Sequence, residues 1–324
     1  MRRADFCGSD ERVVTVEVIR KGRKNTRVVF PDGHQELVPT STLVDAAPLP
    51  ETEPRPSGER IVPTTPLKLL YRSLREIGGS RAECFQSIME RIQNRCYGPV
   101  GAQFIAELFA RSQSHMKFFN NQHEPFYVAG ARPNRAINHS ANEFVELLSN
   151  GAVDLGDGVR PFEYVDYEIN PLRTTRSCFE TGKPATSSGA GGMDLLLRSG
   201  GNDPLPAVGE IKAQTEQVGP TFALLQALTY AAELVTPSQL ARLGLHFEDH
   251  FGDVCTTGPD AKVDVLVFLE APVDVGDDLR FALTLAADLL NDARISTSIR
   301  RIEFLEWHID ADAVSITAIP SPAN

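Results

Sequence analysis

The segment LPAVGEIKAQTE, residues 205–216, places charged residues inside a run that otherwise has the composition of a buried strand. Glu210 and Lys212 are separated by one residue, and because side chains alternate across a strand, both project to the same face. An unpaired charge in a protein interior is costly even after the surroundings relax. A chain that keeps this pair in an apolar strand therefore needs neighbouring groups, or an ion, to balance the charges.

A second apolar segment, GGMDLLLRS at residues 191–199, carries Asp194 on the face opposite to Met193 and Leu195. If the two segments form neighbouring strands, Asp194 and Glu210 converge, with Lys212 one step farther along. Mg²⁺ prefers a few carboxylate oxygens, a backbone carbonyl and several waters, and it leaves positions for phosphate oxygens. The pattern therefore predicts a divalent-metal site that acts on a phosphodiester, with Lys212 orienting the attacking water or stabilising charge on the phosphate.

Asp194, a spacer at 195–209 and Glu210-Ile211-Lys212 resemble the D…(D/E)-x-K motif of the PD-(D/E)XK nuclease superfamily, with Met193 in place of the nominal proline. In the helix-like segment that follows, Gln226-Ala-Leu-Thr-Tyr230 resembles the Q-x-x-x-Y motif of the RecB-like and exonuclease-like branch. The i, i+4 spacing places Gln226 and Tyr230 on one helix face. The resemblance spans residues 134–310 in the order of its elements.

This resemblance implies an α/β fold with a restriction-endonuclease-like core, in which helices flank a mixed central sheet. Asp194, Glu210 and the carbonyl of Ile211 would bind Mg²⁺ or Mn²⁺, while Gln226 and Tyr230 would orient the site and the substrate backbone. The family favours DNA as the substrate, and restriction, phage defence or DNA repair as the cellular role.

The segment SANEFVELL resembles the first core helix of these nucleases, whose acidic residue completes the metal site. Glu143 is the closer match and Glu146 is the reserve. However, Ser140-Ala-Asn-Glu143 also has the pattern of a capping box, in which Glu143 would bind the backbone N–H of Ser140. Both interpretations of Glu143 remain open at this point.

Basic residues that could contact nucleic-acid phosphates lie in two segments. Arg173 and Arg176 precede the Asp194 segment, and RKGRKNTR at residues 20–27 contains Lys21, Arg23 and Lys24. Both groups are equally compatible with an ordinary solvated surface. Because the formal net charge is -11, any binding to nucleic acid must depend on such local patches.

The pattern along the chain predicts four parts. Residues 1–46 have the alternation and turns of a small SH3-like or Tudor-like β-barrel, 47–66 form a proline-rich linker, 67–130 form a helical connector, and 131–324 form the nuclease domain. In the last part, a helix is followed by three strands, a helix, a strand, a helix and a terminal pair of strands. The barrel could bind a protein partner.

The composition, with 42% apolar and 23% charged residues, is ordinary for a globular protein. No signal-peptide pattern or membrane-spanning run is visible, so we expect a cytoplasmic protein without a membrane partner. The five cysteines contain no C-x-x-C pair, which favours reduced thiols.

Two alternatives to a nuclease remain. The first is a non-catalytic DNA-binding or assembly subunit that retains the fold, although its expected signature, loss of Asp194, Glu210 or Lys212, is absent from the sequence. In the second, the barrel recruits a partner and the core is a scaffold. The sequence leaves the oligomeric state and the polarity of cleavage open.

Overall fold

The computed structural model contains two compact units, Met1–Ile61 and Val62–Asn324, which are described separately. The boundary lies inside the expected 47–66 linker. The described residues are 2–7, 13–21, 25–29, 35–39, 43–45, 65–75, 80–93, 100–116, 126–127, 139–174, 192–201, 203–216, 218–252 and 262–320.

The first unit contains an antiparallel five-stranded sheet in the order β4-β3-β2-β1-β5. Its strands are β1 (Arg2–Cys7), β2 (Val13–Lys21), β3 (Asn25–Val29), β4 (Gln35–Pro39) and β5 (Leu43–Asp45). The strand alternation expected at residues 1–46 corresponds to these strands. Closure of this sheet into an SH3-like or Tudor-like barrel stays a prediction.

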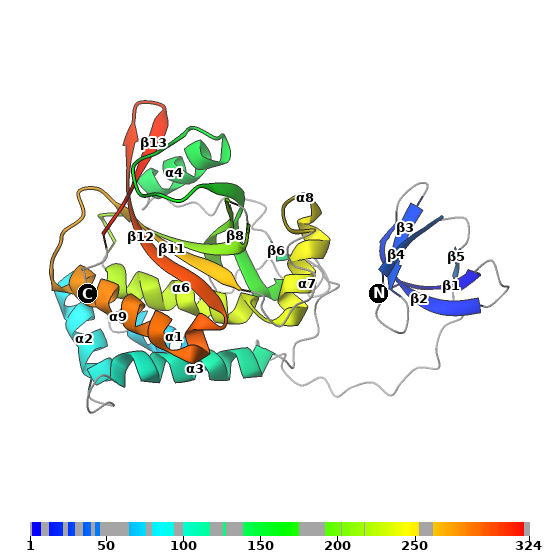
Figure 1. Ribbon diagram of the computed structural model, residues 1–324, viewed down its shortest axis with the longest axis horizontal. Coiled ribbons are helices and arrows are strands. Elements are labelled where there is room, and N and C mark those ends of the chain that lie inside the picture. Colours follow the sequence, from blue (N-terminus) through cyan, green and yellow to red (C-terminus); the bar gives the residue numbers. More distant parts are fainter. Residues whose placement is uncertain are drawn as a thin grey trace. The chain divides into compact units, whose positions relative to one another are not determined.

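The second unit is an α/β structure built on a mixed sheet (Figure 1). In spatial order the strands are β8 (Phe162–Thr174), β9 (Met193–Ser199), β10 (Pro206–Lys212), β11 (Val263–Glu270), β12 (Ile299–Asp310), β13 (Ala313–Ala318) and β7 (Val153–Leu155), and the two-residue β6 (Phe126–Tyr127) extends the β8 edge. The β10–β11 and β11–β12 pairs are parallel, whereas β8–β9, β9–β10 and β12–β13 are antiparallel.

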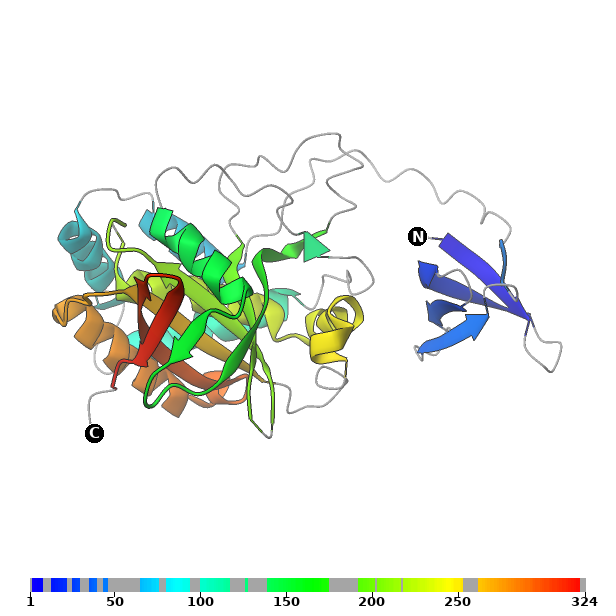
Figure 2. The ribbon, with the colours of Figure 1, turned by 90° about the horizontal axis from the view of Figure 1, so that it is seen from above.

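Helices cover both faces of this sheet (Figures 1 and 2). α4 (His139–Ser149) packs on one face, where its Phe144 contacts Phe268 and Trp307. α6 (Pro220–Leu234) packs on the other, together with α1 (Pro66–Arg75), α3 (Val100–Met116) and α9 (Asp277–Asn291). The remaining helices are α2 (Arg81–Gln93), α7 (Pro237–His246), α8 (Glu248–Phe251) and α10 (Ala293–Ser296).

α6 is the central helix of the second unit. Every one of its residues is buried, because the sheet lies on one side of the helix and α1, α3 and α9 lie on the other. A helix with apolar residues on most of its circumference is typical of such an interior position. The expected helix around Gln226 and Tyr230 is therefore confirmed, and it begins at Pro220.

The helices expected to form a separate connector at 67–130 are part of the second unit. α1 and α3 pack against α6, and their residues Leu67, Ile105 and Phe109 belong to the same apolar cluster as Val208 of the sheet. The reason is physical: α6 has apolar residues on the side away from the sheet as well, so it needs a second layer to cover that side. The helices of this segment therefore belong to the core of the second unit.

The first turn of α6 is tied to α9 by Asp278. The α6 N-cap residue, Gly219, makes no side-chain cap, and Asp278 Oδ1 instead accepts a hydrogen bond from the backbone N–H of Thr221 at 3.0 Å. The Thr221 hydroxyl in turn donates to the Asp278 carbonyl at 3.2 Å. One side chain thus satisfies an end group of α6 and fixes where the helix begins.

We expect Asp278→Ala to lower the free energy of unfolding by about 1 kcal/mol, since it removes the acceptor for the Thr221 N–H. Asp278→Asn keeps an oxygen at that position and should cost less than half as much. Urea denaturation of the two variants beside the unsubstituted chain measures this difference. Equal losses in the two variants would contradict the capping role.

Candidate functional site

β9 and β10 place the two predicted carboxylates opposite each other. Their antiparallel register runs from Pro206↔Arg198 to Gly209↔Leu195. Asp194 and Glu210 are the next residues of the two strands beyond this last pair, and their carboxyl groups are close enough to interact. Residues directly opposite in an antiparallel pair point to the same face. The expected adjacency of the two strands is confirmed, and the side chains lie on the α6 face, as does Val208.

Close approach of the strands just before this point requires a glycine. A Cβ atom at Gly209 would lie 2.8 Å from the Cβ of Leu195 and 3.3 Å from the Phe268 ring. Only a residue without a side chain fits there without displacing a neighbour. Gly209 therefore helps to hold Glu210 in register with Asp194.

Glu210 and Lys212 form a buried ion pair. The Lys212 Nζ lies 2.7 Å from Glu210 Oε1, and the side-chain exposures are 6% and 0%. The same ammonium lies 3.4 Å from Glu216 and donates to Gln226 Oε1 of α6 at 3.4 Å. Asp194 Oδ2 accepts the backbone N–H of Ile211 at 3.0 Å. These contacts bring five residues together in one small cluster. We call it the Lys212 cluster, and its members are Asp194, Glu210, Lys212, Glu216 and Gln226.

The Lys212 cluster holds more negative than positive charge. Burial raises the pKa of the Glu210 carboxyl well above its usual range, and the charge of Asp194 raises it further, against the opposing effect of Lys212. Burial lowers the pKa of Lys212, but Glu210, Glu216 and Asp194 together outweigh it, so this pKa is raised and the ammonium keeps its proton. Three carboxyl groups thus surround one ammonium, which leaves two excess negative charges when all are ionised.

The residues of the cluster fit a divalent cation. Glu210 Oε2 is buried and has no hydrogen-bond partner among the described residues when both carboxyls are ionised. A hydrogen bond between Glu210 and Asp194 requires that one of the two carboxyls carries a proton, and it raises the pKa of Glu210. A cation between Asp194 and Glu210 would contact Glu210 Oε2 and balance the excess charge. Within the described ranges, no three His, Cys, Asp or Glu side chains are arranged to hold a metal. The pair would therefore share the ion with backbone and water oxygens, as Mg²⁺ sites commonly do.

Tyr230 lies deeper than Gln226 on the same α6 face. It is fully buried, and burial raises the pKa of its phenol well above the usual range, with Tyr71, Glu233, Glu210 and Asp194 adding to the rise. The two catalytic carboxylates predicted from the sequence are therefore near this ring. Because its side chain does not reach solvent, its position favours orienting the site over contacting a substrate.

Glu143 is not brought to the two carboxylates. It is exposed on α4, which packs on the opposite face of the sheet from Glu210, and it belongs to no three-residue metal group among the described residues. The reserve candidate, Glu146, is also exposed on α4. α4 begins at His139, so Ser140 lies in its first turn and not at the cap position that a capping box requires.

The structure does not describe the side chains of the predicted phosphate-binding arginines and lysines. Arg176, Arg23 and Lys24 lie outside the described residues, and for Arg173 in β8 and Lys21 in β2 the structure describes only the backbone. Their roles stay predictions. The metal-binding role of the Ile211 carbonyl also stays a prediction, because the contact with Asp194 is made by the Ile211 N–H.

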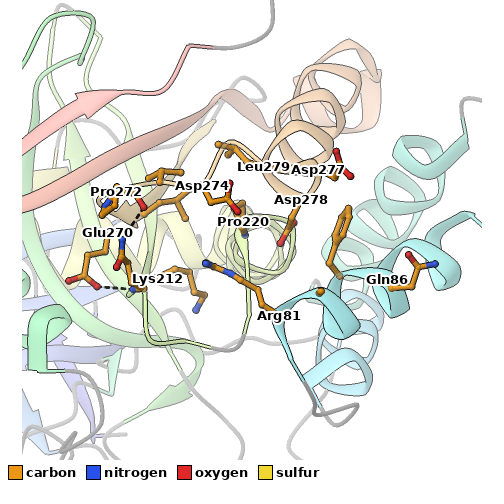
Figure 3. A pocket seen from close by; sticks show the side chains of 16 residues that line it. Arg81, Gln86, Lys212, Pro220, Glu270, Pro272, Asp274, Asp277, Asp278 and Leu279 are labelled. Carbon is orange, nitrogen blue, oxygen red and sulfur yellow. Dashed lines mark hydrogen bonds between the residues drawn. The ribbon is translucent and has the colours of Figure 1, made fainter.

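A pocket of about 650 Å³ adjoins Lys212 at the carboxyl ends of β10 and β11 (Figure 3). The first turn of α2 contributes Arg81, which points toward the middle of the pocket. The acidic residues in the lining outnumber the basic ones: Glu270, Asp274, Asp277 and Asp278 against Arg81 and Lys212. An anionic ligand would enter this pocket more readily with a cation bound beside Lys212.

Sequence reasoning missed Glu216 and Arg81. Glu216 follows Lys212 by four residues within the segment 205–216, so its proximity was visible in the spacing. Arg81 comes from a helix 131 positions before Lys212, as the numbering shows. No local pattern indicates so distant a contact.

We expect Lys212→Met to lower the free energy of unfolding by about 3–5 kcal/mol in metal-free buffer near neutral pH, because Glu210 then lacks its buried counter-charge. The double variant Glu210→Gln/Lys212→Met should recover most of this loss. The cost of Lys212→Met should also shrink as the pH falls, since Glu210, whose pKa is already raised, takes up a proton. Denaturant unfolding at several pH values tests this, and additive losses in the double variant would contradict it.

Comparison with known proteins identifies no relative of this chain. No protein-family model, curated protein or solved structure matches it. No helix among the described residues has both the length and the apolar character needed to span a membrane. The functional assignment therefore depends on the geometry of the Lys212 cluster and on the motif spacing.

Proposed function

We propose that this chain is a divalent-metal-dependent nuclease that hydrolyses phosphodiester bonds, with DNA as the substrate, on a restriction-endonuclease-like core. The observation that carries the proposal is the buried Glu210 oxygen that has no hydrogen-bond partner among the described residues, in a cluster where Glu210 and Glu216 both lie within 3.4 Å of one ammonium. A bound Mg²⁺ or Mn²⁺ would supply charge balance, polarise a phosphate oxygen and lower the pKa of a bound water.

The residues of the cluster would have separate roles in metal binding, charge stabilisation and positioning. Asp194 and Glu210 would hold the cation from two neighbouring strands, which fixes its position relative to the sheet. The Lys212 ammonium, which keeps its proton, would stabilise negative charge that develops on the phosphate oxygens. Gln226 would keep this ammonium in place through its contact at 3.4 Å.

The rival interpretation, a non-catalytic subunit that retains the fold, is less consistent with the burial of these groups. Replacing a buried ion pair by apolar residues of similar volume is often neutral or stabilising. A chain without chemistry to perform gains no stability from three carboxyl groups around one ammonium. Retention of the whole cluster therefore supports catalysis, and the N-terminal unit is left as the candidate site for a protein partner.

We expect Mn²⁺ to raise the melting temperature of the protein more at pH 8 than at pH 6. The pKa of Glu210 is raised in the folded state, so without metal its contribution to stability is complete below its unfolded pKa and is lost as the pH rises through the folded value. The metal competes with this proton and restores the loss. Differential scanning fluorimetry measures the shift, and Glu210→Gln should remove most of it. A shift that is equal at both pH values would contradict the assignment.

We expect Asp194→Asn, Glu210→Gln and Lys212→Met each to lower kcat for DNA cleavage at least about 100-fold, since each removes charge stabilisation at the reacting phosphate. Glu143→Gln is the matched control, because Glu143 is exposed on the other face and should leave kcat within about twofold. Linear, circular and single-stranded DNA, and RNA, are incubated with Mg²⁺, Mn²⁺ or EDTA. Cleavage that persists in the Glu210 variant would show that the site is elsewhere.

A further inference from the structure

A second buried ion pair lies beside the Lys212 cluster, and sequence reasoning did not anticipate it. Lys68 of α1 lies 3.1 Å from Glu233 of α6, with side-chain exposures of 3% and 0%. The Thr65 hydroxyl donates to the same carboxylate at 3.0 Å. Both charged groups are thus paired and buried. They join α1 to α6 through residues that are 165 positions apart in the chain.

This pair contacts Tyr230, which lies one helical turn after Gln226 on α6. The Lys68 ammonium lies over the Tyr230 ring, 5.0 Å from its centre, and Tyr71 of α1 packs against Phe222 at 5.1 Å between ring centres. Gln226, Tyr230 and Glu233 are spaced i, i+4 and i+7, so they lie on one side of the helix. One end of this stripe meets Lys212, and the other end meets Lys68.

From these contacts we propose that Lys68 and Glu233 are positioning residues, which act through Tyr230 to hold α6 and its Gln226 against Lys212. The inference rests on the proposed nuclease function, and it assigns to α1 a role in the site that the motif residues do not cover. A cation over an aromatic ring is attracted to its face, and the Glu233 carboxylate fixes where that cation sits. The ring is therefore held by a charged group of α1.

A merely structural ion pair would stabilise the fold without affecting the chemical step at temperatures well below melting. A positioning pair differs because small displacements of groups around a reacting phosphate lower the rate strongly. The consequence should be a loss in kcat with little change in KM, since neither residue touches the substrate. This distinction makes the role testable.

The test uses Lys68→Met/Glu233→Gln, a double substitution that removes both charges at similar volume and so avoids leaving one buried charge unpaired. The control is Asp264→Asn/Arg301→Met, which removes a buried contact with an N–O distance of 2.8 Å at the opposite end of β11 from Leu269, the partner of Lys212. Arg300 at 2.6 Å from Asp264 and Glu303 at 3.0 Å from Arg301 belong to the same ionic network and are left unchanged. Both proteins carry 3-fluorotyrosine at the six tyrosines of the chain, and Tyr230→Phe assigns the Tyr230 resonance.

We expect the Lys68/Glu233 variant to shift or broaden the Tyr230 fluorine resonance and to lower kcat at least about tenfold, with KM within about twofold. The control variant should leave both readouts unchanged. An unaltered Tyr230 resonance, or a wild-type kcat in the Lys68/Glu233 variant, would overturn the proposal. If the unsubstituted protein cleaves no nucleic acid, the nuclease function fails, and the Tyr230 resonance alone then decides whether the pair positions this ring.

Discussion

The site depends on the burial of Lys212 together with more carboxyl groups than it can neutralise. β10 has a hydrogen-bonded neighbour on each side and α6 over one face, and Glu210 is fully buried, so bulk solvent does not screen its charge. The charges must therefore be satisfied by protein groups or by an ion. Three further residues reach Lys212 or Glu210 from different positions: Asp194, Glu216 and Gln226. The need to satisfy the buried charges therefore explains why two strands and a helix meet at this point.

α6 connects the buried charges of the Lys212 cluster to the other helices of the second unit. Two of its polar side chains contact other elements: Gln226 contacts Lys212 of β10, whereas Glu233 contacts Lys68 of α1. Because no side of the helix is exposed, it cannot shift at one end without disturbing contacts at the other. The N-terminal helices consequently share a core with the sheet, and the site is supported from both sides of α6.

Alternation and spacing predicted much of this arrangement. The strands around Asp194 and Glu210, the Gln226–Tyr230 helix and their order follow from patterns within a few residues, which is the range over which periodicity carries information. The Lys68–Glu233 pair and the packing of α1 on α6 could not be found in this way, because they join residues far apart in the chain. Glu143 shows the converse: a motif-like position in a predicted helix does not determine which face of the sheet the helix covers.

The end of the β9–β10 ladder explains how a site can open inside a closely paired sheet. Beyond Gly209↔Leu195 the pairing between the two strands stops, and the Ile211 N–H, which would otherwise need a partner, donates to Asp194 Oδ2. A side chain thus takes the place of a backbone acceptor where the strands separate. Asp194 therefore has a structural and a chemical role at once, and an asparagine there, which still offers an acceptor oxygen, separates the two better than an alanine would.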